Sequence, residues 1–331
     1  MNIKNKNVLI TGANGLVGVP TVEKCLKLGA KTVHAIDLNL NNLLPLKEKN
    51  SNLVVESLDL TYLHNIENYF KKNKIDIVFH LAGIKGSPTR AKLSPADYFY
   101  PMVMFNTNVF KASFDAKVEW LVYLSSVGVY APADVMEEDS VWDTMPSKND
   151  WYPGWAKRCG ELALETLKQQ YDWKNYTIIR PANIFGENDN FSPNATVIAS
   201  NTYKLFHTEN SEIECWGDGS AKRDFVFARD VADAVITVTV NEIHDTVNFG
   251  SGKAVSIKET IELLLKVYKN LFDKNITIKW DKTKPNGDLL RCLGQSKQTK
   301  YKLLPLTPLE EALRLTVLGY YNKFSKRSTT Q

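Results

Sequence analysis

The chain of 331 residues is short of cysteine, of long apolar runs and of clustered charge. Its four cysteines, Cys25, Cys159, Cys215 and Cys292, are scattered without a Cys-x-x-Cys pair, which disfavours a zinc site or a disulfide framework and favours a reducing compartment. No apolar run approaches the roughly 18 residues that span a bilayer, and no signal-peptide pattern opens the chain. The formal net charge of +4 is spread out, apart from a basic tail at 323–327. These features predict a cytoplasmic protein that binds neither membrane nor nucleic acid, and no metal site is expected.

What the sequence does contain is a glycine-rich turn between a strand and a helix. Val8–Ile10 is an apolar run typical of a buried parallel strand, and three glycines at a spacing of three precede an amphipathic segment. Such a turn presents backbone N–H groups and the positive end of a helix dipole to a pyrophosphate. A plain loop is the alternative. The residues predicted to bind a dinucleotide here are Gly12, Asn14, Gly15, Leu16, Val17 and Gly18.

An acidic residue follows the next strand. Thr32–Ile36 reads as a second strand and Asp37 ends it, about 20–25 residues after the glycines, where a carboxylate binds both hydroxyls of an adenosine ribose. Because a carboxylate repels a 2′-phosphate, Asp37 predicts NAD rather than NADP. The alternative for Asp37 is a solvated side chain at a strand end.

Strand and helix patterns alternate through the first half of the chain. Further strands are predicted at 53–56, 75–81, 121–124 and 176–179, and small or polar residues follow the last three. This order predicts an α/β fold with a Rossmann-type doubly wound parallel sheet, whose ligands bind beyond the carboxyl ends of the strands.

The alternation of strand and helix patterns ends after Gly186, where polar, turn-rich segments follow. We expect residues 1–185, with 228–252 returning to them, to form the NAD-binding Rossmann domain, and 186–227 with 253–331 to form a smaller C-terminal α/β substrate lobe. In that lobe Ser256 and Thr307 are each followed three residues later by Glu, which predicts two capping boxes, the second with Pro308 at the first helical position.

The order of these motifs resembles that of the extended short-chain dehydrogenase/reductase family, the NAD-dependent sugar epimerases and dehydratases, from about Asn7 to Leu318. Within it the chain is similar to enzymes of the GDP-fucose synthase type, through Asp189-Asn190-Phe191, Trp216-Gly217-Asp218-Gly219 and Arg223-Asp224-Phe225. Besides the glycine turn and Asp37, the resemblance implies NAD contacts from Asn39, Asp59, Leu60, Leu81, Ala82, Gly83, Asn108, Ser125, Lys157, Pro181 and Asn183.

The resemblance also implies a mechanism. Ser126 aligns a sugar hydroxyl, a tyrosine removes its proton, and Lys157 lowers the pKa of that tyrosine and holds the nicotinamide ribose. The family places the tyrosine four residues before the lysine, but Pro153 stands there and Tyr152 lies five before. On a regular helix Tyr152 is about 140° away from Lys157. Because Pro153 and Gly154 disfavour a regular helix, we expect a looser first turn that brings Tyr152 to the nicotinamide. A rim aromatic is the alternative.

Two further departures bear on the reaction. Where the GDP-fucose synthase type has a Cys and a His for epimerisation, this chain has Gly128 and Thr196, neither of which titrates near neutral pH. Where the dehydratases carry an acidic pair after the serine, it has Val127-Gly128. We therefore expect neither C3/C5 epimerisation nor 4,6-dehydration, which leaves hydride transfer at C4. Gly128 also leaves room for a substituent on C5, such as the extra carbon of a heptose.

The substrate contacts follow from the same comparison. A guanidinium group binds phosphate oxygens in bidentate fashion, so Arg223 and Arg291 are the expected diphosphate contacts. Trp216 is expected to stack on the base, with a core position as the alternative, and solvated loop positions are the alternative for Lys85 and Arg90. The predicted substrate-binding residues are Lys85, Arg90, Ser126, Asn183, Asn190, Val197, Trp216, Lys222, Arg223 and Arg291.

The sequence thus predicts an NAD-dependent 4-dehydrogenase of a GDP-hexose or GDP-heptose, as in capsule polysaccharide synthesis. Two alternatives stay open: a nucleotide-sugar C4-epimerase or 4-reductase, and a non-catalytic dinucleotide-binding sensor or scaffold. The apolar faces of the helical segments 99–114 and 155–169 suggest, by the resemblance, a homodimer through a four-helix bundle. Burial within one chain is the alternative.

Overall fold

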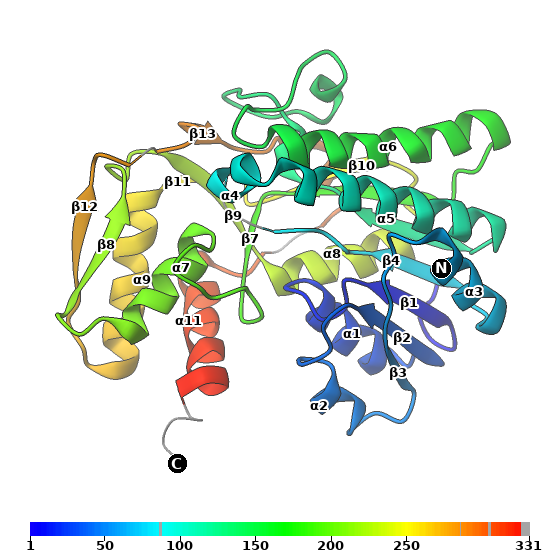
Figure 1. The fold of residues 1–331 in the computed structure, drawn as a ribbon, viewed down its shortest axis with the longest axis horizontal. Coiled ribbons are helices and arrows are strands. Elements are labelled where there is room, and N and C mark those ends of the chain that lie inside the picture. Colours follow the sequence, from blue (N-terminus) through cyan, green and yellow to red (C-terminus); the bar gives the residue numbers. More distant parts are fainter. Residues whose placement is uncertain (86–87, 285, 304–305, 326–331) are drawn as a thin grey trace.

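The computed structural model describes residues 1–85, 88–284, 286–303 and 306–325, leaving out the side chains of 88–90 and 325. A large parallel sheet with helices on both faces occupies one side of the molecule, and a group of shorter strands and helices lies beside it (Figure 1). The predicted α/β class is confirmed.

The large sheet has seven strands in the order β10-β6-β5-β4-β1-β2-β3, and each neighbouring pair is parallel. The chain winds outward from β1 in both directions, as a doubly wound sheet does. The strands are β1 (Asn7–Thr11), β2 (Thr32–Asp37), β3 (Leu53–Ser57), β4 (Ile77–His80), β5 (Trp120–Leu124), β6 (Tyr176–Pro181) and β10 (Thr246–Phe249).

Helices bury both faces of this sheet. Along β1 the side chains alternate: Val8 and Ile10 lie in the core cluster beneath α1 and α8, and Leu9 lies in the cluster beneath α5 and α6. Two-sided burial explains why these strands are almost uninterrupted apolar runs. The helices around the sheet are α1 (Gly18–Lys27), α2 (Leu44–Lys47), α3 (Leu63–Lys72), α4 (Pro88–Leu93), α5 (Pro95–Asp115), α6 (Trp151–Tyr171) and α8 (Ala228–Val240).

The smaller group is built on β9 (Lys222–Phe227), which pairs with β7 (Asn183–Phe185), β11 (Ala254–Ser256) and β13 (Leu290–Arg291). A separate pair joins β8 (Glu212–Trp216) to β12 (Thr277–Asp281). The remaining helices are α7 (Val197–His207), α9 (Ile257–Phe272), α10 (Ser296–Lys300) and α11 (Leu309–Tyr320), with short helical turns η1 (Val127–Val129), η2 (Glu138–Val141) and η3 (Tyr321–Ser325).

Of the two predicted capping boxes, one forms. Ser256 Oγ accepts the backbone N–H of Glu259 at 3.1 Å, and the Glu259 carboxylate accepts that of Ser256 at 3.0 Å. The second prediction is wrong, since α11 starts at Leu309 and Thr307 makes no cap bond. The Thr307 hydroxyl instead donates to Asp230 of α8 at 2.7 Å, a tertiary partner that competes with the local cap. Among the residues described, no helix has the length and apolar character to cross a membrane.

Candidate active site

The glycine turn leaves no space for side chains at two of its positions. Gly12 has φ +67°, and a Cβ there would lie 2.7 Å from the backbone of Ala82 at the end of β4. A Cβ on Gly18 would overlap the carbonyl of Gly12. These glycines therefore allow the turn after β1 to pack closely against the segment that follows β4.

Asp37 stands beside this turn. Its carboxylate accepts the backbone N–H of Asn14 at 3.0 Å and that of Asn39 at 3.3 Å. The two bonds fix the carboxylate at the end of β2, within reach of a ribose lying on the glycine turn.

A cleft of about 1420 Å³ extends from the glycine turn, past the ends of β4, β5 and β6, to β8 and β9. Most of the predicted site residues line it. For the cofactor these are Gly12, Asn14, Gly15, Leu16, Val17, Gly18, Asp37, Asn39, Leu81, Gly83, Ser125, Lys157, Pro181 and Asn183. For the substrate they are Lys85, Ser126, Asn183, Asn190, Val197, Trp216, Arg223 and Arg291.

Other predicted residues do not line the cleft: Asp59, Leu60, Ala82, Asn108, Tyr152 and Lys222. Asn108 donates to the carbonyls of Leu60 and Thr61, at 2.9 and 3.0 Å, and the Asp59 carboxylate accepts from Thr61, so these side chains hold the turn after β3. The side chain of Arg90 lies outside the described residues.

Lys157 is buried in the middle of the cleft wall. Its Nζ donates to the carbonyl of Leu124 at 2.7 Å and lies 4.8 Å from the centre of the Tyr123 ring. Burial lowers the pKa of Lys157 to about 7, against the opposing attraction of Glu161. Nearby, the Ser126 hydroxyl accepts the backbone N–H of Gly128 at 3.0 Å.

The expected looser turn before Lys157 is wrong. Helix α6 is regular from Trp151, and its first helical bond runs from the N–H of Gly154 to the carbonyl of Asp150 at 2.7 Å. Pro153 falls in the first turn, where a backbone N–H has no helical partner in any case. Pro153 lines the cleft, whereas Tyr152 does not and is 38% exposed.

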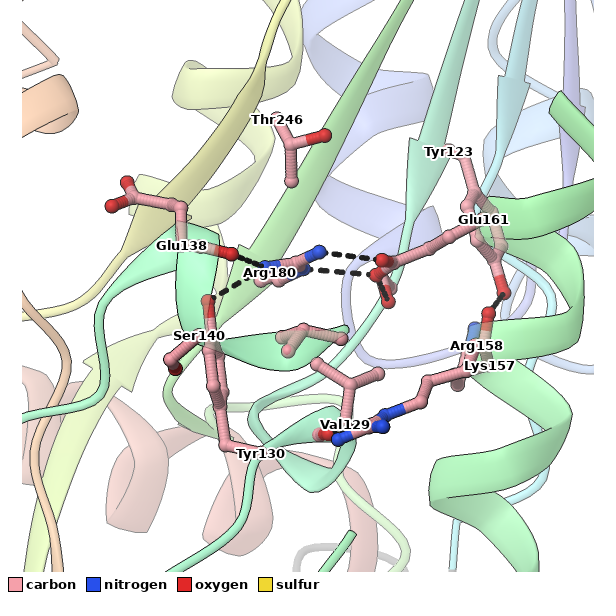
Figure 2. Close-up of polar contacts among 12 residues, drawn as sticks. Tyr123, Val129, Tyr130, Glu138, Ser140, Lys157, Arg158, Glu161, Arg180 and Thr246 are labelled. Carbon is pink, nitrogen blue, oxygen red and sulfur yellow. Dashed lines mark hydrogen bonds and ion pairs between the residues drawn. The ribbon is translucent and has the colours of Figure 1, made fainter. Parts of the chain in front are cut away.

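A buried ion pair joins Arg180 to Glu161, which lies one helical turn after Lys157 (Figure 2). Arg180 of β6 and Glu161 of α6 are each 2% exposed and meet at 2.6 Å, and the Glu161 carboxylate also accepts the Ser125 hydroxyl at 2.5 Å. Arg180 further donates to Tyr130 and to the carbonyl of Glu138, at 2.9 and 2.7 Å. This network ties α6 and β6 to the segment that follows β5.

The far end of the cleft holds two arginines in different electrostatic states. Arg291 forms ion pairs with Asp150 and Asp288, both at 2.5 Å, and these carboxylates raise its pKa against burial. Among the described residues, Arg223 takes part in no ion pair. Burial lowers the pKa of Arg223 to about 10, and the nearby charge of Arg291 lowers it too. Arg223 is therefore the guanidinium whose charge is open to a phosphate. Trp216, which also lines the cleft, is 47% exposed.

Lys85 bridges the cleft. Its Nζ contacts the Asp189 carboxylate at 2.7 Å and the carbonyl of Ile184 at 3.2 Å. Sequence reasoning gave no role to three carboxylates here, Asp150, Asp189 and Asp288. The basic partners of Asp150 and Asp189 are remote in the chain, whereas Asp288 lies three residues before its partner Arg291. Glu161 carried a signal, since it lies one helical turn after Lys157.

Residues 8–250 match the model of the NAD dependent epimerase/dehydratase family. The chain belongs to this family. It is 27% identical to GDP-L-fucose synthase 1 of Arabidopsis thaliana, over 99% of this chain and 97% of that protein. Among solved structures, UDP-glucose 4-epimerase of Thermotoga maritima with UDP-glucose is 25% identical and has a TM-score of 0.80, covering 98% of this chain and 100% of that one.

The cofactor of this family is NAD, and the glycine turn fits it. A Thermus thermophilus UDP-glucose 4-epimerase solved with NAD shares the fold, at 22% identity and a TM-score of 0.80 over 96% of this chain and 99% of that one. In the present chain the glycine turn places the N-terminus of α1 at the cleft, which suits a pyrophosphate, and Asp37 suits a ribose diol. NAD supplies a hydride acceptor when it is bound.

Proposed function

We propose that this family member oxidises C4 of a GDP-sugar, a hexose or a heptose, to the 4-keto sugar, without C3/C5 epimerisation or 4,6-dehydration. The observation that carries the proposal is the composition of the cleft. Ser126 and Lys157, which can bind a sugar hydroxyl, line the cleft between the glycine turn and Arg223. Gly128 and Thr196 stand at the positions where epimerisation at C3 or C5 needs an acid or a base. Similarity to GDP-L-fucose synthases supports the GDP-sugar.

Each part of the cleft has a role in this proposal. Residues 1–185 with 228–252 hold NAD through the predicted cofactor residues, and 186–227 with 253–331 hold the sugar nucleotide. Arg223 binds the diphosphate and Trp216 stacks on the base. Asn183, Asn190 and Val197 contact the diphosphate and the sugar.

Gly128 supports a bulky C5 substituent. A Cβ on Gly128 would lie 3.3 Å from Ser126 Oγ and 3.4 Å from Asp150 Cβ, so a larger residue there would crowd the Ser126 hydroxyl. We base the preference for a heptose, as used in capsule polysaccharide synthesis, over a hexose on the lack of a side chain at Gly128, which lines the cleft.

The test is incubation of the purified protein with NAD and, separately, GDP-mannose, a GDP-heptose and UDP-glucose. The expected result is NADH absorbance and a 4-keto product with the GDP-sugars. In D₂O no deuterium is expected at C3 or C5, because Gly128 and Thr196 stand at the acid and base positions and the cleft carboxylates Asp150, Asp189 and Asp288 are held in ion pairs. Absence of NADH and of any keto product with every sugar nucleotide would refute the proposal.

A C4-epimerase is the second candidate, favoured by the 25% identity to the Thermotoga maritima 4-epimerase over almost the whole chain. Such an enzyme would return the hydride to the other face of the sugar. NMR would then show the epimer with no net NADH in the same incubation.

We also propose a homodimer through α5 and α6, whose outer faces expose Tyr100, Met104 and Leu162 at 64%, 42% and 52%. Figure 1 shows the two helices side by side along one edge of the molecule. Light scattering should give a dimer mass, and Leu162→Glu should shift it toward the monomer.

A further inference from the structure

Among the described residues in the middle of the cleft, Lys157 is titratable and takes part in no ion pair. The described carboxylates that line the cleft around β5, β7 and β13 are all engaged in the ion pairs with Arg291 and Lys85. These carboxylates are Asp150, Asp189 and Asp288. None of them is free to take a proton without breaking an ion pair. Lys157, by contrast, is bound by its Nζ to the neutral carbonyl of Leu124.

The position of Lys157 Nζ suits contact with a substrate hydroxyl. It lies between the ends of β4 and β5, since a Cβ on Gly83 would be 3.7 Å away and the Leu124 carbonyl is at 2.7 Å. Ser126 follows Leu124 by two residues and lines the same cleft. An uncharged amine can donate one N–H to the Leu124 carbonyl and still direct its lone pair at a hydroxyl.

The groups that face Lys157 from neighbouring elements favour the uncharged amine. Glu161 on α6 attracts a proton to Lys157, but its own charge is matched by Arg180 of β6. Tyr123 of β5 is buried and its pKa is raised well above the usual value, so it is neutral. His80 of β4 is buried with its pKa lowered to about 3, so it is neutral too. Burial then dominates and lowers the pKa of Lys157 to about 7.

Tyr152 is poorly placed for the same task. The regular first turn of α6 directs Pro153 into the cleft wall and leaves Tyr152 outside it. The chain therefore lacks a phenol one helical turn before Lys157.

We infer that the amine of Lys157 itself accepts the proton of the sugar hydroxyl that Ser126 orients. The inference rests on the proposed function. In the step, the O–H bond breaks and its proton forms an N–H bond to Nζ, giving an ammonium. The carbon is oxidised to a ketone as its C–H bond releases a hydride to NAD, which is reduced. The proton later leaves Lys157 for solvent.

The first test measures turnover against pH and variants. Wild-type kcat should rise with pH through about 7, as Lys157 loses its proton. Lys157→Ala and Lys157→Arg should each lower kcat by about 10²–10⁴-fold. Added methylamine should rescue Lys157→Ala at least tenfold, in proportion to its neutral form, and guanidinium should not. Lys168→Arg, an exposed position on the same helix, is the matched control and should keep wild-type turnover.

The second test needs no turnover. In ¹⁵N-lysine NMR of the intact protein, the signal lost in Lys157→Arg should titrate near pH 7, with and without bound NAD. A midpoint above 9, wild-type turnover in Lys157→Arg, rescue by guanidinium, or loss of the kcat pH limb in Tyr152→Phe would each overturn the inference. A wild-type protein that oxidises no sugar nucleotide would overturn the proposed function as well, so the two failures are distinguishable.

Discussion

Replacing Glu161 by Gln should destabilise the protein severely. The substitution removes the carboxylate that pairs with Arg180 at 2.6 Å and accepts the Ser125 hydroxyl at 2.5 Å, yet it preserves the side-chain volume. Both ion-pair partners are 2% exposed, so water cannot replace the lost charge. An uncompensated buried guanidinium costs about 3–5 kcal/mol. We expect a loss of that size in the free energy of unfolding of Glu161→Gln.

The assay is urea unfolding followed by far-ultraviolet circular dichroism, with the slope compared between variants. Asp115→Asn is the matched control, because Asp115 pairs with Lys111 at the surface and should change stability by less than about 0.5 kcal/mol. The double variant Glu161→Gln with Arg180→Met should recover part of the loss, since the unpaired charge is then removed as well. The reasoning would be refuted by a free energy of unfolding of Glu161→Gln within about 1 kcal/mol of wild type, because that is the scale of a single neutral hydrogen bond.

Other predictions concern the cleft. Gly12→Ala should weaken NAD binding about tenfold or more, measured by fluorescence titration, because its φ of +67° adds roughly 1–2 kcal/mol of strain and its Cβ meets Ala82. Asp37→Asn should lower NAD affinity about ten- to hundredfold, as expected for loss of a charged hydrogen bond worth about 1.5–3 kcal/mol, in the same titration. Burial lowers the Lys157 pKa from 10.5 to about 7, so the unfolded chain binds more protons in this window and stability rises with pH. Thermal midpoints of Lys157→Met should lack that rise. Asp150→Asn should tighten GDP binding at low salt, by calorimetry, because it frees charge on Arg291; weaker binding would contradict this.

Most of the fold was predictable because its signals are local. Each strand of the large sheet is a short apolar run, and two-sided burial makes that pattern strong. The failure at Thr307 shows the limit of such reasoning. Its local sequence is a capping box, but Asp230, remote in the sequence, offers its hydroxyl a better partner.

The candidate site was predictable where backbone geometry decides it and unpredictable where charge pairing does. Gly12 and Asp37 take their roles from the turn between strand and helix, which the spacing encodes. Arg291 was expected to be a phosphate ligand, but its electrostatic state depends on Asp150, which lies far away in the sequence. No periodicity or spacing reports such a contact.

The first turn of α6 shows how a glycine can mislead a sequence argument. Gly128 was interpreted as a missing catalytic group, and Gly154 as a helix breaker. In the structure the two residues pack against each other, since a Cβ on Gly154 would overlap the carbonyl of Gly128. This close approach holds the start of α6 against η1, and Pro153 in the first turn costs the helix no hydrogen bond. The close contact of these two glycines therefore fixes where α6 starts relative to η1, and with it the position of Lys157.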